Sequence, residues 1–290
     1  MKTIRKFKEN DLELLMSFKN DNTEKKLWTL ERVKRELMDF GRGYGENVLI
    51  EEDNGAISAF AGFVKTTPEK GEFFISPFVL KSSKNCLLME RLIKIAKENN
   101  AKWIRSSVFC EEAEKKKIFC DYQFYNAFEF ITLQCDLGEI KLNDVTSSIV
   151  LIKIPREKLD PEKFAELNNS AFKNVQNAAI INKQQANDTF NSFYRYGELS
   201  QIWSDEFGTY VGFVEVTSDG YIEAIATNPK FQKRGVGKFM LSELLKVAKG
   251  ESFTNIKSII SSENTSSLAL HRSLGFREIE RREVMQLDLE

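Results

Sequence analysis

The chain has 290 residues, in which 42 lysine and arginine residues nearly cancel 43 aspartate and glutamate residues. This balance gives no global field that would favour nucleic acid or an acidic membrane surface, and no apolar run reaches the roughly 18 residues of a membrane span. The basic N-terminus lacks the apolar core of a signal peptide, so we expect a cytoplasmic protein without nucleic-acid or membrane partners. At about 150 residues per domain, the length predicts two domains.

The cysteine and histidine content argues against a metal site. All cysteines lie in the first half without a CxxC pair, and the chain has a single histidine. Zinc sites usually take paired cysteine and histidine ligands. We therefore expect no metal, and we expect the cysteines to be reduced thiols; they are Cys86, Cys110, Cys120 and Cys135.

The first half contains a strongly periodic segment, LLMERLIKIAKENN, at residues 87–100. Its apolar residues follow the spacing of one helix face, so the segment predicts a helix. The sequence WIRSSV at 103–108 predicts the buried strand that follows. The predicted apolar face consists of Leu88, Met89, Leu92, Ile93 and Ala96.

The second half opens with a predicted strand at 148–155 and a helix at 160–172, where Asp160 is a suitable cap and Pro161 fits the first turn. The apolar face of a later helix consists of Met240, Leu241, Leu244, Leu245 and Ala248. The remaining predictions are strands at 208–217, 221–229, 256–261 and 283–289, and a helix at 265–274 that ends at Gly275.

The two halves resemble each other at a constant offset of 152 residues. At this offset the helical segment 87–100 aligns with 239–252, Pro77 with Pro229 and Phe124 with Phe276. The alignment needs no gap from about residue 71 to residue 137. We therefore expect two copies of one fold, a mixed sheet with flanking helices, in domains 1–140 and 141–290.

A loop with two glycines, Gly235 and Gly237, separates a strand from the helix that begins near Lys238. Glycines let backbone N–H groups converge on an anion at a helix N-terminus, and Lys233 and Arg234 add positive charge. Other phosphate loops fit badly, because a Walker A motif and a dinucleotide fingerprint need different residues here. A turn whose glycines serve geometry alone is the alternative.

The loop sequence Gln232-Lys233-Arg234-Gly235-Val236-Gly237 resembles the Q/R-x-x-G-x-G/A signature of GCN5-related N-acetyltransferases. Further on, the family's N-x-x-A-x-x-x-Y-x-x-x-G-F spacing is occupied by Asn264, Ser267, His271, Gly275 and Phe276. The resemblance covers residues 148–290 well, and the repeat extends it weakly to 1–137. It implies an α/β (α+β) protein with two tandem GNAT folds, each a mixed, mostly antiparallel sheet flanked by helices.

The resemblance implies acetyl-CoA as the co-substrate. Backbone N–H groups from Gln232 to Lys238 would hold its pyrophosphate, the strand end before the loop would pair with the pantetheine arm, and Asn264 would contact it from the far side. The implied cofactor-binding residues are Ile225, Ala226, Thr227, Gln232, Lys233, Arg234, Gly235, Val236, Gly237, Lys238, Asn264 and Ser267.

The first copy lacks the glycine loop. At the offset of 152, Leu80, Ser83 and Asn85 replace Gln232 and the two glycines. We therefore expect one cofactor site per chain, in the second half, and a degenerate first copy.

Two residues are candidates for proton transfer. His271 stands where the family usually has a tyrosine that protonates the coenzyme A sulfur, and Phe119 replaces it in the first copy. Glu223 precedes Ile225 by two residues, which predicts the same strand face, and related enzymes use a glutamate near this point to order a water that deprotonates the amine. A packing histidine and an ordinary surface carboxylate are the alternatives.

The sequence says little about the acceptor, which is the molecule that would receive the acetyl group. The resemblance places its site near residues 168–197, with Phe193, Tyr194 and Tyr196 as candidates for contact or for core packing. We expect acetyl transfer to a primary amine of a small molecule. The alternatives are a protein or peptide N-acetyltransferase and a non-catalytic acyl-CoA sensor, and the chain is expected to be a monomer or a homodimer.

Overall fold

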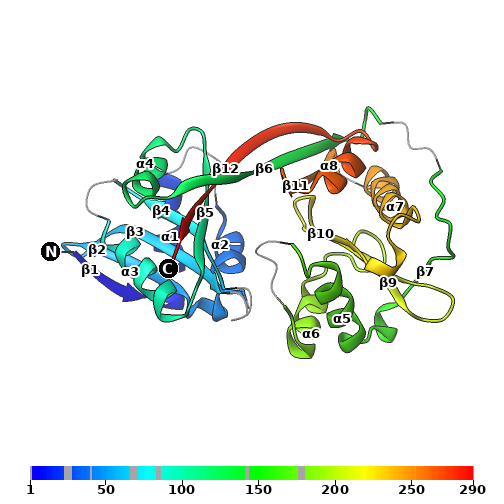
Figure 1. The fold of residues 1–290 in the computed structure, drawn as a ribbon, viewed down its shortest axis with the longest axis horizontal. Helices are drawn as coiled ribbons and strands as arrows, with labels where there is room; N and C mark the ends of the chain where they lie inside the picture. The colour runs from blue at the N-terminus through cyan, green and yellow to red at the C-terminus, as the bar shows by residue number, and fades with distance from the viewer. Residues whose placement is uncertain are drawn as a thin grey trace. The chain divides into compact units, whose positions relative to one another are not determined.

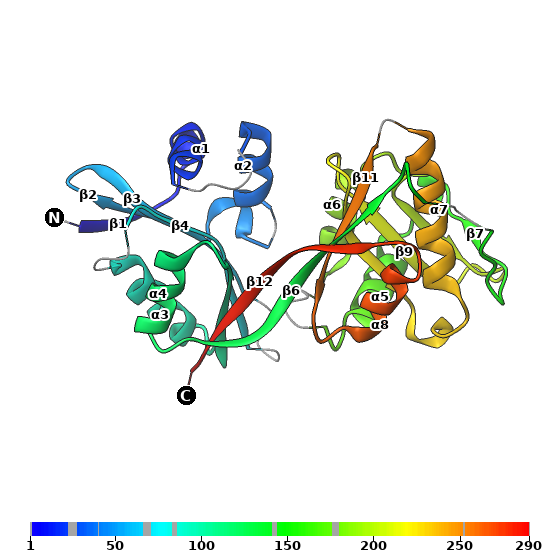
Figure 2. The same cartoon turned by 90° about the horizontal axis from the view of Figure 1, so that it is seen from above.

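The protein forms two compact units, each described here by itself (Figures 1 and 2). The structure, a computed structural model, describes residues 2–22, 28–39, 41–65, 71–82, 86–140, 144–175, 180–251 and 253–289. Unit 1 comprises Met1–Phe128 together with Arg282–Glu290, and unit 2 comprises Glu129–Arg281.

Unit 1 is a sheet with helices on both faces (Figure 2). Its strand order is β1-β2-β3-β4-β5, extended by the end of β12, and among the described strand pairs only β4 and β5 are parallel. The strands are β1 (Lys2–Lys6), β2 (Val48–Asp53), β3 (Ala56–Lys65), β4 (Glu72–Leu80), β5 (Trp103–Phe109) and β12 (Arg277–Asp288); the helices are η1 (Glu9–Asp11), α1 (Leu12–Asp21), α2 (Leu30–Leu37), η2 (Gly43–Gly45), α3 (Leu87–Glu98) and α4 (Ala113–Asp121).

Alternation along β2 sends side chains to two separate cores in unit 1. Val48 and Ile50 pack in the core under α1 and α2, whereas Leu49 packs in the core with α3 and α4. The predicted helix face of α3 is confirmed, because Leu88, Met89, Leu92 and Ala96 are fully buried in that second core.

Unit 2 repeats this architecture with α5 and α6 on one face and α7 and α8 on the other. Its strand order is β6-β11-β10-β9-β8-β7, and of the strands that the structure describes here only β10 and β11 pair in parallel. The strands are β6 (Tyr125–Asp136), β7 (Ile152–Lys153), β8 (Gln201–Ser204), β9 (Tyr210–Val216), β10 (Tyr221–Thr227) and β11 (Asn255–Ser261); the helices are η3 (Arg156–Lys158), α5 (Pro161–Ala171), α6 (Lys183–Ser192), η4 (Pro229–Phe231), α7 (Val236–Gly250) and α8 (Thr265–Arg272).

Two local predictions for unit 2 are confirmed. The Asp160 carboxylate accepts hydrogen bonds from the N–H groups of Glu162 and Lys163 and so caps α5. All five predicted apolar residues of α7 are fully buried, and they pack in one core with β9, β10 and β11.

Each half of the chain gives its last strand to the other unit. From Phe130 to Asp136, β6 pairs antiparallel with β11 of unit 2. From Arg282 to Asp288, β12 pairs antiparallel with β5 of unit 1. The compact units therefore differ from the continuous segments 1–140 and 141–290 that the repeat predicts.

The repeat is confirmed downstream of the helices, but the expectation of an ungapped alignment is wrong upstream of them. Phe119 and Phe124 in unit 1, and His271 and Phe276 in unit 2, form ring pairs with the same centroid separation of 4.9 Å. In the parallel pairs, however, Ile75 lies opposite Ser106, 31 residues later, whereas Ile222 lies opposite Ser258, 36 residues later. The segment that joins the two parallel strands, which includes the loop and the helix after it, is thus five residues shorter in unit 1.

Candidate functional site

The glycine loop of unit 2 is a strained turn that opens directly into α7. Gly235 is the N-cap residue with φ of 81°, and Lys233 also has a left-handed φ, of 60°. Only glycine adopts this conformation at little cost, which explains Gly235. A Cβ at Gly235 would also lie 3.2 Å from the Thr146 carbonyl oxygen, so the position has little room for a side chain.

The loop presents a row of backbone donors. Phe239 makes the first intrahelical bond of α7, from its N–H to the Gly235 carbonyl at 2.9 Å, so the N–H groups of Val236, Gly237 and Lys238 precede the helical ladder. The Arg234 carbonyl accepts from the Ser148 N–H at 3.1 Å. Because N–H and C=O point oppositely across a trans peptide, the Gly235 N–H points away from Ser148. The arrangement is suited to an anion.

Gly237 allows α7 and α8 to approach closely. A Cβ at this position would lie 3.3 Å from Leu270 Cδ2 on α8 and 3.6 Å from Thr227 Oγ1 at the end of β10. The second glycine of the motif therefore sits where the strand end, the loop and α8 meet. Gln232, at the start of the motif, reaches back to the Thr227 carbonyl through its amide Nε2 at 3.5 Å.

The parallel strands β10 and β11 separate beside this loop. Their last pair is Ile222 with Ser258, and in the described residues Ile225, Ala226 and Thr227 pair only with β9 on the other side. The edge of β10 that faces β11 can therefore accept an extended ligand as an added strand.

A bulge in β10 overturns the expectation that Glu223 shares a face with Ile225. The register shifts between Ile222 and Ala224, so Ala224 lies opposite Glu215 and Ile225 lies opposite Val214. Ile225 packs in the α7 core, whereas the charge of Glu223 acts on Glu215, which contacts α6. Strict alternation, on which the expectation rests, does not hold across a bulge.

His271 is completely buried on α8. Its Nδ1 lies 2.8 Å from the Ser267 carbonyl, which can only accept, so Nδ1 carries the hydrogen and Nε2 holds a lone pair. Among the described residues no group hydrogen-bonds to Nε2. Burial lowers the pKa of His271 below 6.5, which disfavours the imidazolium that a proton donor needs. Its predicted role as a general acid remains a prediction.

The burial of His271 gives a pH test of the fold. Because its folded-state pKa lies below the unfolded value, its contribution to stability is complete above pH 6.5 and is lost as pH falls through the folded pKa. The His271→Phe variant, which carries the Phe119 residue of unit 1, should lack this loss, worth at most about 1.4 kcal/mol per pH unit. Urea unfolding at pH 7.5 and 5.5 measures it, and equal acid sensitivity of both proteins would contradict the assignment.

Asn264 and Ser267 form the start of α8. The Asn264 side-chain oxygen accepts from the Ser267 N–H at 3.1 Å and from the Ser266 hydroxyl at 3.0 Å, so it caps the helix. Asn264 is exposed and Ser267 half-buried. The cap fixes the helix that carries His271.

In unit 1, the start of the corresponding helix holds a carboxylate of the protein itself. Glu51 on β2, with a side chain only 2% exposed, accepts from the Leu88 N–H in the first turn of α3 at 2.8 Å. It also accepts from the Ser58 hydroxyl at 2.7 Å and pairs with Lys2 Nζ at 2.9 Å. An internal anion thus occupies this helix end. Ser83 and Asn85, the residues predicted to replace the two glycines of the motif in the first copy, lie outside the described residues.

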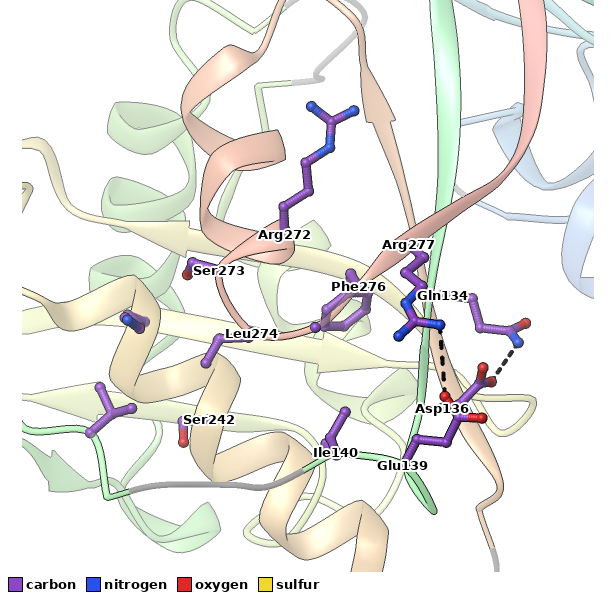
Figure 3. A pocket seen from close by; sticks show the side chains of 13 residues that line it. Gln134, Asp136, Glu139, Ile140, Ser242, Arg272, Ser273, Leu274, Phe276 and Arg277 are labelled. Carbon is purple, nitrogen blue, oxygen red and sulfur yellow. Dashed lines mark hydrogen bonds and ion pairs between the residues drawn. The ribbon is translucent and has the colours of Figure 1, made fainter.

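A pocket of about 460 Å³ lies beside α7, α8 and the end of β6 in unit 2 (Figure 3). Lys238 of the glycine motif reaches its lining, together with Arg272 and Arg277. On the far side Glu139 lies 3.8 Å from Arg277. The pocket therefore adjoins the glycine loop through Lys238, and its lining carries both cationic and acidic side chains, a feature that motif spacing does not reveal.

The aromatic residues predicted near the acceptor are engaged in packing. Phe193 is buried and stacks on Tyr196 with centroids 5.8 Å apart. The Tyr196 hydroxyl donates to the Ile154 carbonyl at 2.7 Å, and Tyr194 packs against the α7 core. Residues 176–179 of the predicted acceptor segment lie outside the described part of the chain.

Comparison with known proteins identifies the second half most clearly. Residues 163–276 match the acetyltransferase (GNAT) family model. The ribosomal protein bS18-alanine N-acetyltransferase of Salmonella typhimurium is 27% identical over 88 residues, 30% of this chain, and the N-alpha-acetyltransferase RimI of Mycobacterium tuberculosis is 32% identical over 79 residues, 25% of this chain. These matches span 60% and 48% of the relatives' own lengths.

Solved structures match the whole chain in fold. A GCN5-related N-acetyltransferase from Sphaerobacter thermophilus superimposes with a TM-score of 0.71 at 13% identity, covering 99% of this chain and 95% of the other. A tandem GNAT protein from the clavulanic acid biosynthesis pathway gives 0.63 at 12% identity, covering 99% and 98%. Every described helix is too short or too polar to span a lipid bilayer. Residues 163–276, which hold the glycine motif, are therefore similar in sequence to GNAT acetyltransferases, and the whole chain shares the fold of a tandem GNAT protein.

Proposed function

We propose that unit 2 binds acetyl-CoA and transfers the acetyl group to a primary amine. The observation that carries this proposal is the row of backbone N–H groups at the start of α7, beside the separated strands β10 and β11. A helix N-terminus contributes about 0.3 to 2 kcal/mol to anion binding, and each hydrogen bond to a charged group about 1.5 to 3 kcal/mol. Several such donors together are enough to hold a diphosphate.

The residues of the loop and the strand then have separate roles. The N–H groups of 232–238 hold the diphosphate, and the β10 edge at 225–227 pairs with the pantetheine arm. Lys238 extends the cationic surface into the neighbouring pocket, where Arg272 and Arg277 suit the nucleotide phosphate. Asn264 and Ser267 border the arm from α8. Positioning of the thioester against the amine supplies a large part of the rate.

The reaction requires two proton transfers. The amine must lose a proton before its nitrogen attacks the thioester carbonyl, and the departing thiolate must gain one as the carbon–sulfur bond breaks. A general acid or base contributes about 10² to 10⁴-fold. In the family pattern, we propose Glu223 as the residue nearest the first transfer and His271 as the one nearest the second. Because Nε2 of the neutral His271 holds a lone pair, it must first accept a proton from the attacking amine nitrogen before it can pass one to the thiolate.

We propose that the molecule that receives the acetyl group is small. This choice is supported by the tandem GNAT protein of the clavulanic acid biosynthesis pathway, which shares the tandem of two GNAT folds. The relatives named as protein N-acetyltransferases favour a second candidate, the α-amine of a protein. Both acceptors present a primary amine, so the chemistry above serves either.

A coenzyme A release assay distinguishes the candidates. Purified protein and acetyl-CoA are combined with small primary amines, with a peptide that begins with alanine, and with an Nα-blocked lysine peptide. Release of free thiol with small amines alone supports the first candidate, and release with the alanine peptide supports the second. Cofactor binding without release from any acceptor would contradict an acetyltransferase and leave a sensor.

A further inference from the structure

Glu215, on β9, is a half-buried carboxyl group without an ion pair among the described residues. Its Oε1 lies 3.2 Å from the Ser192 hydroxyl on α6. That hydroxyl is also 2.7 Å from the Thr189 carbonyl, which can only accept. The Ser192 hydroxyl has one hydrogen for two acceptors, the Thr189 carbonyl and the Glu215 carboxyl, so its hydrogen bond satisfies the carboxyl only in part.

The surroundings of Glu215 favour its neutral form. Burial, together with the nearby negative charge of Glu223 on β10, raises its pKa to about 8. From α6 the facing group is the uncharged Ser192 hydroxyl. A carboxyl of this kind is a much stronger base than an exposed glutamate, and a cation placed beside it would restore its charge.

Glu215 stands beside the place where the proposed reaction occurs. In the β9–β10 ladder it lies opposite Ala224, directly after the bulge, so the two Cα atoms are about 5 Å apart. The β10 edge proposed to hold the pantetheine arm begins at the next residue, Ile225. Glu215 faces α6, which belongs to the segment predicted to shape the acceptor site.

We propose that Glu215 receives the ammonium group of the acceptor and takes one of its protons, an assignment that rests on the proposed acetyltransferase function. The Glu215 carboxylate and R–NH₃⁺ become a carboxylic acid and R–NH₂. The nitrogen of R–NH₂ attacks the thioester carbon, the carbon–sulfur bond breaks, and a second nitrogen proton goes to the departing thiolate. The Glu215 proton then passes to solvent, so each turnover releases one proton.

The same arrangement defines the class of acceptor. Glu223 lies close enough for its charge to raise the pKa of Glu215, so a cationic amine beside Glu215 is attracted and an anion is repelled. An amine whose own carboxylate lies on the adjacent carbon, as in a free amino acid, is disfavoured. Monoamines, polyamines and peptide α-amines meet the requirement.

The Glu215→Gln variant tests the assignment with the acceptor that gives the highest turnover in the coenzyme A release assay. We expect kcat/KM to fall at least about 100-fold, the acetyl-CoA Kd to stay within about twofold, and Glu215→Asp to recover part of the activity. The wild-type log kcat/KM should rise with pH up to about 8 and then level, whereas the Gln variant should lose this inflection. Glu206→Gln, a change at an exposed carboxylate of the same unit, is the matched control and should not differ from wild type.

A stability measurement checks the same residue without an acceptor. Because its folded pKa is raised, the contribution of Glu215 to stability is complete below about pH 4.5 and is lost as pH rises through about 8. Glu215→Gln should therefore unfold at a temperature about 2 °C or more above wild type at pH 8.5, and near wild type at pH 5.

The outcomes separate this inference from the function on which it rests. If wild type acetylates an amine and Glu215→Gln retains both its rate and the pH inflection, Glu215 is not the proton acceptor, and the acetyltransferase stands. Equal or faster turnover of free alanine than of an alanine-initiated peptide would overturn the acceptor class. If wild type acetylates no amine, the proposed function fails, and the inference fails with it.

Discussion

Replacement of Gly235 by valine should weaken acetyl-CoA binding at least about 100-fold while the protein stays folded. Valine at φ of 81° costs roughly 1 to 2 kcal/mol or more, and its Cβ would meet the Thr146 carbonyl oxygen. Relief of both strains moves the peptide that carries the first α7 donors. Loss of two hydrogen bonds to a charged group, at about 1.5 to 3 kcal/mol each, corresponds to 100-fold or more in Kd.

Isothermal titration of the variant with acetyl-CoA measures the effect. Gly208→Val is the matched control, because Gly208 also has a left-handed φ, of 77°, but a Cβ there would meet no atom within 4 Å. The control should show the backbone strain without loss of binding. Unchanged affinity in Gly235→Val would mean that the loop is a structural turn and not the anion cradle.

Replacement of Glu51 by glutamine should lower the free energy of unfolding by about 2 to 4 kcal/mol. The carboxylate holds the first turn of α3, the Ser58 hydroxyl and the Lys2 ammonium in a buried site, and an amide can satisfy only part of this network. The loss should appear in urea unfolding followed by a probe in unit 1.

Glu46→Gln provides the comparison for that experiment. Glu46 also pairs with a lysine, Lys6 at 2.7 Å, but both side chains are largely exposed. Exposed pairs contribute little, so this variant should unfold with wild type. If Glu51→Gln were equally neutral, the carboxylate would not be the internal anion of unit 1.

Local sequence patterns predicted the parts of the fold that depend on near neighbours. The buried face of α7, the Asp160 cap of α5 and the glycine motif at the start of α7 all follow from residues within a turn or two of one another. The repeat was also visible, because matching helix faces and the aromatic pair in each unit preserve one offset.

The exchange of last strands could not be predicted in this way. An edge strand such as β6 offers the same backbone groups to any neighbour, so pairing with β11 is decided by distant parts of the chain. The five-residue difference between β4 and α3 leaves no mark in the sequence, because it falls in a loop and the helix after the loop still aligns.

Two carboxyl groups, one in each unit, show the same limit of local sequence patterns. Glu51 and Glu215 are single acidic residues in strands, without a motif, and their roles depend on α3 and on α6 with β10, respectively. The prediction that Glu223 shares a strand face with Ile225 is wrong for a related reason. A bulge changes the alternation of side chains without leaving a mark in the sequence. Long-range contacts, more than residue type, define these roles.

A crystal structure of the full chain with acetyl-CoA tests the central claim most directly. The account predicts one molecule per chain, with its diphosphate against the N–H groups of Gly235 to Lys238 and its pantetheine arm along the β10 edge. A diphosphate bound at the start of α3 near Leu88, or the same occupancy in both units, would contradict it.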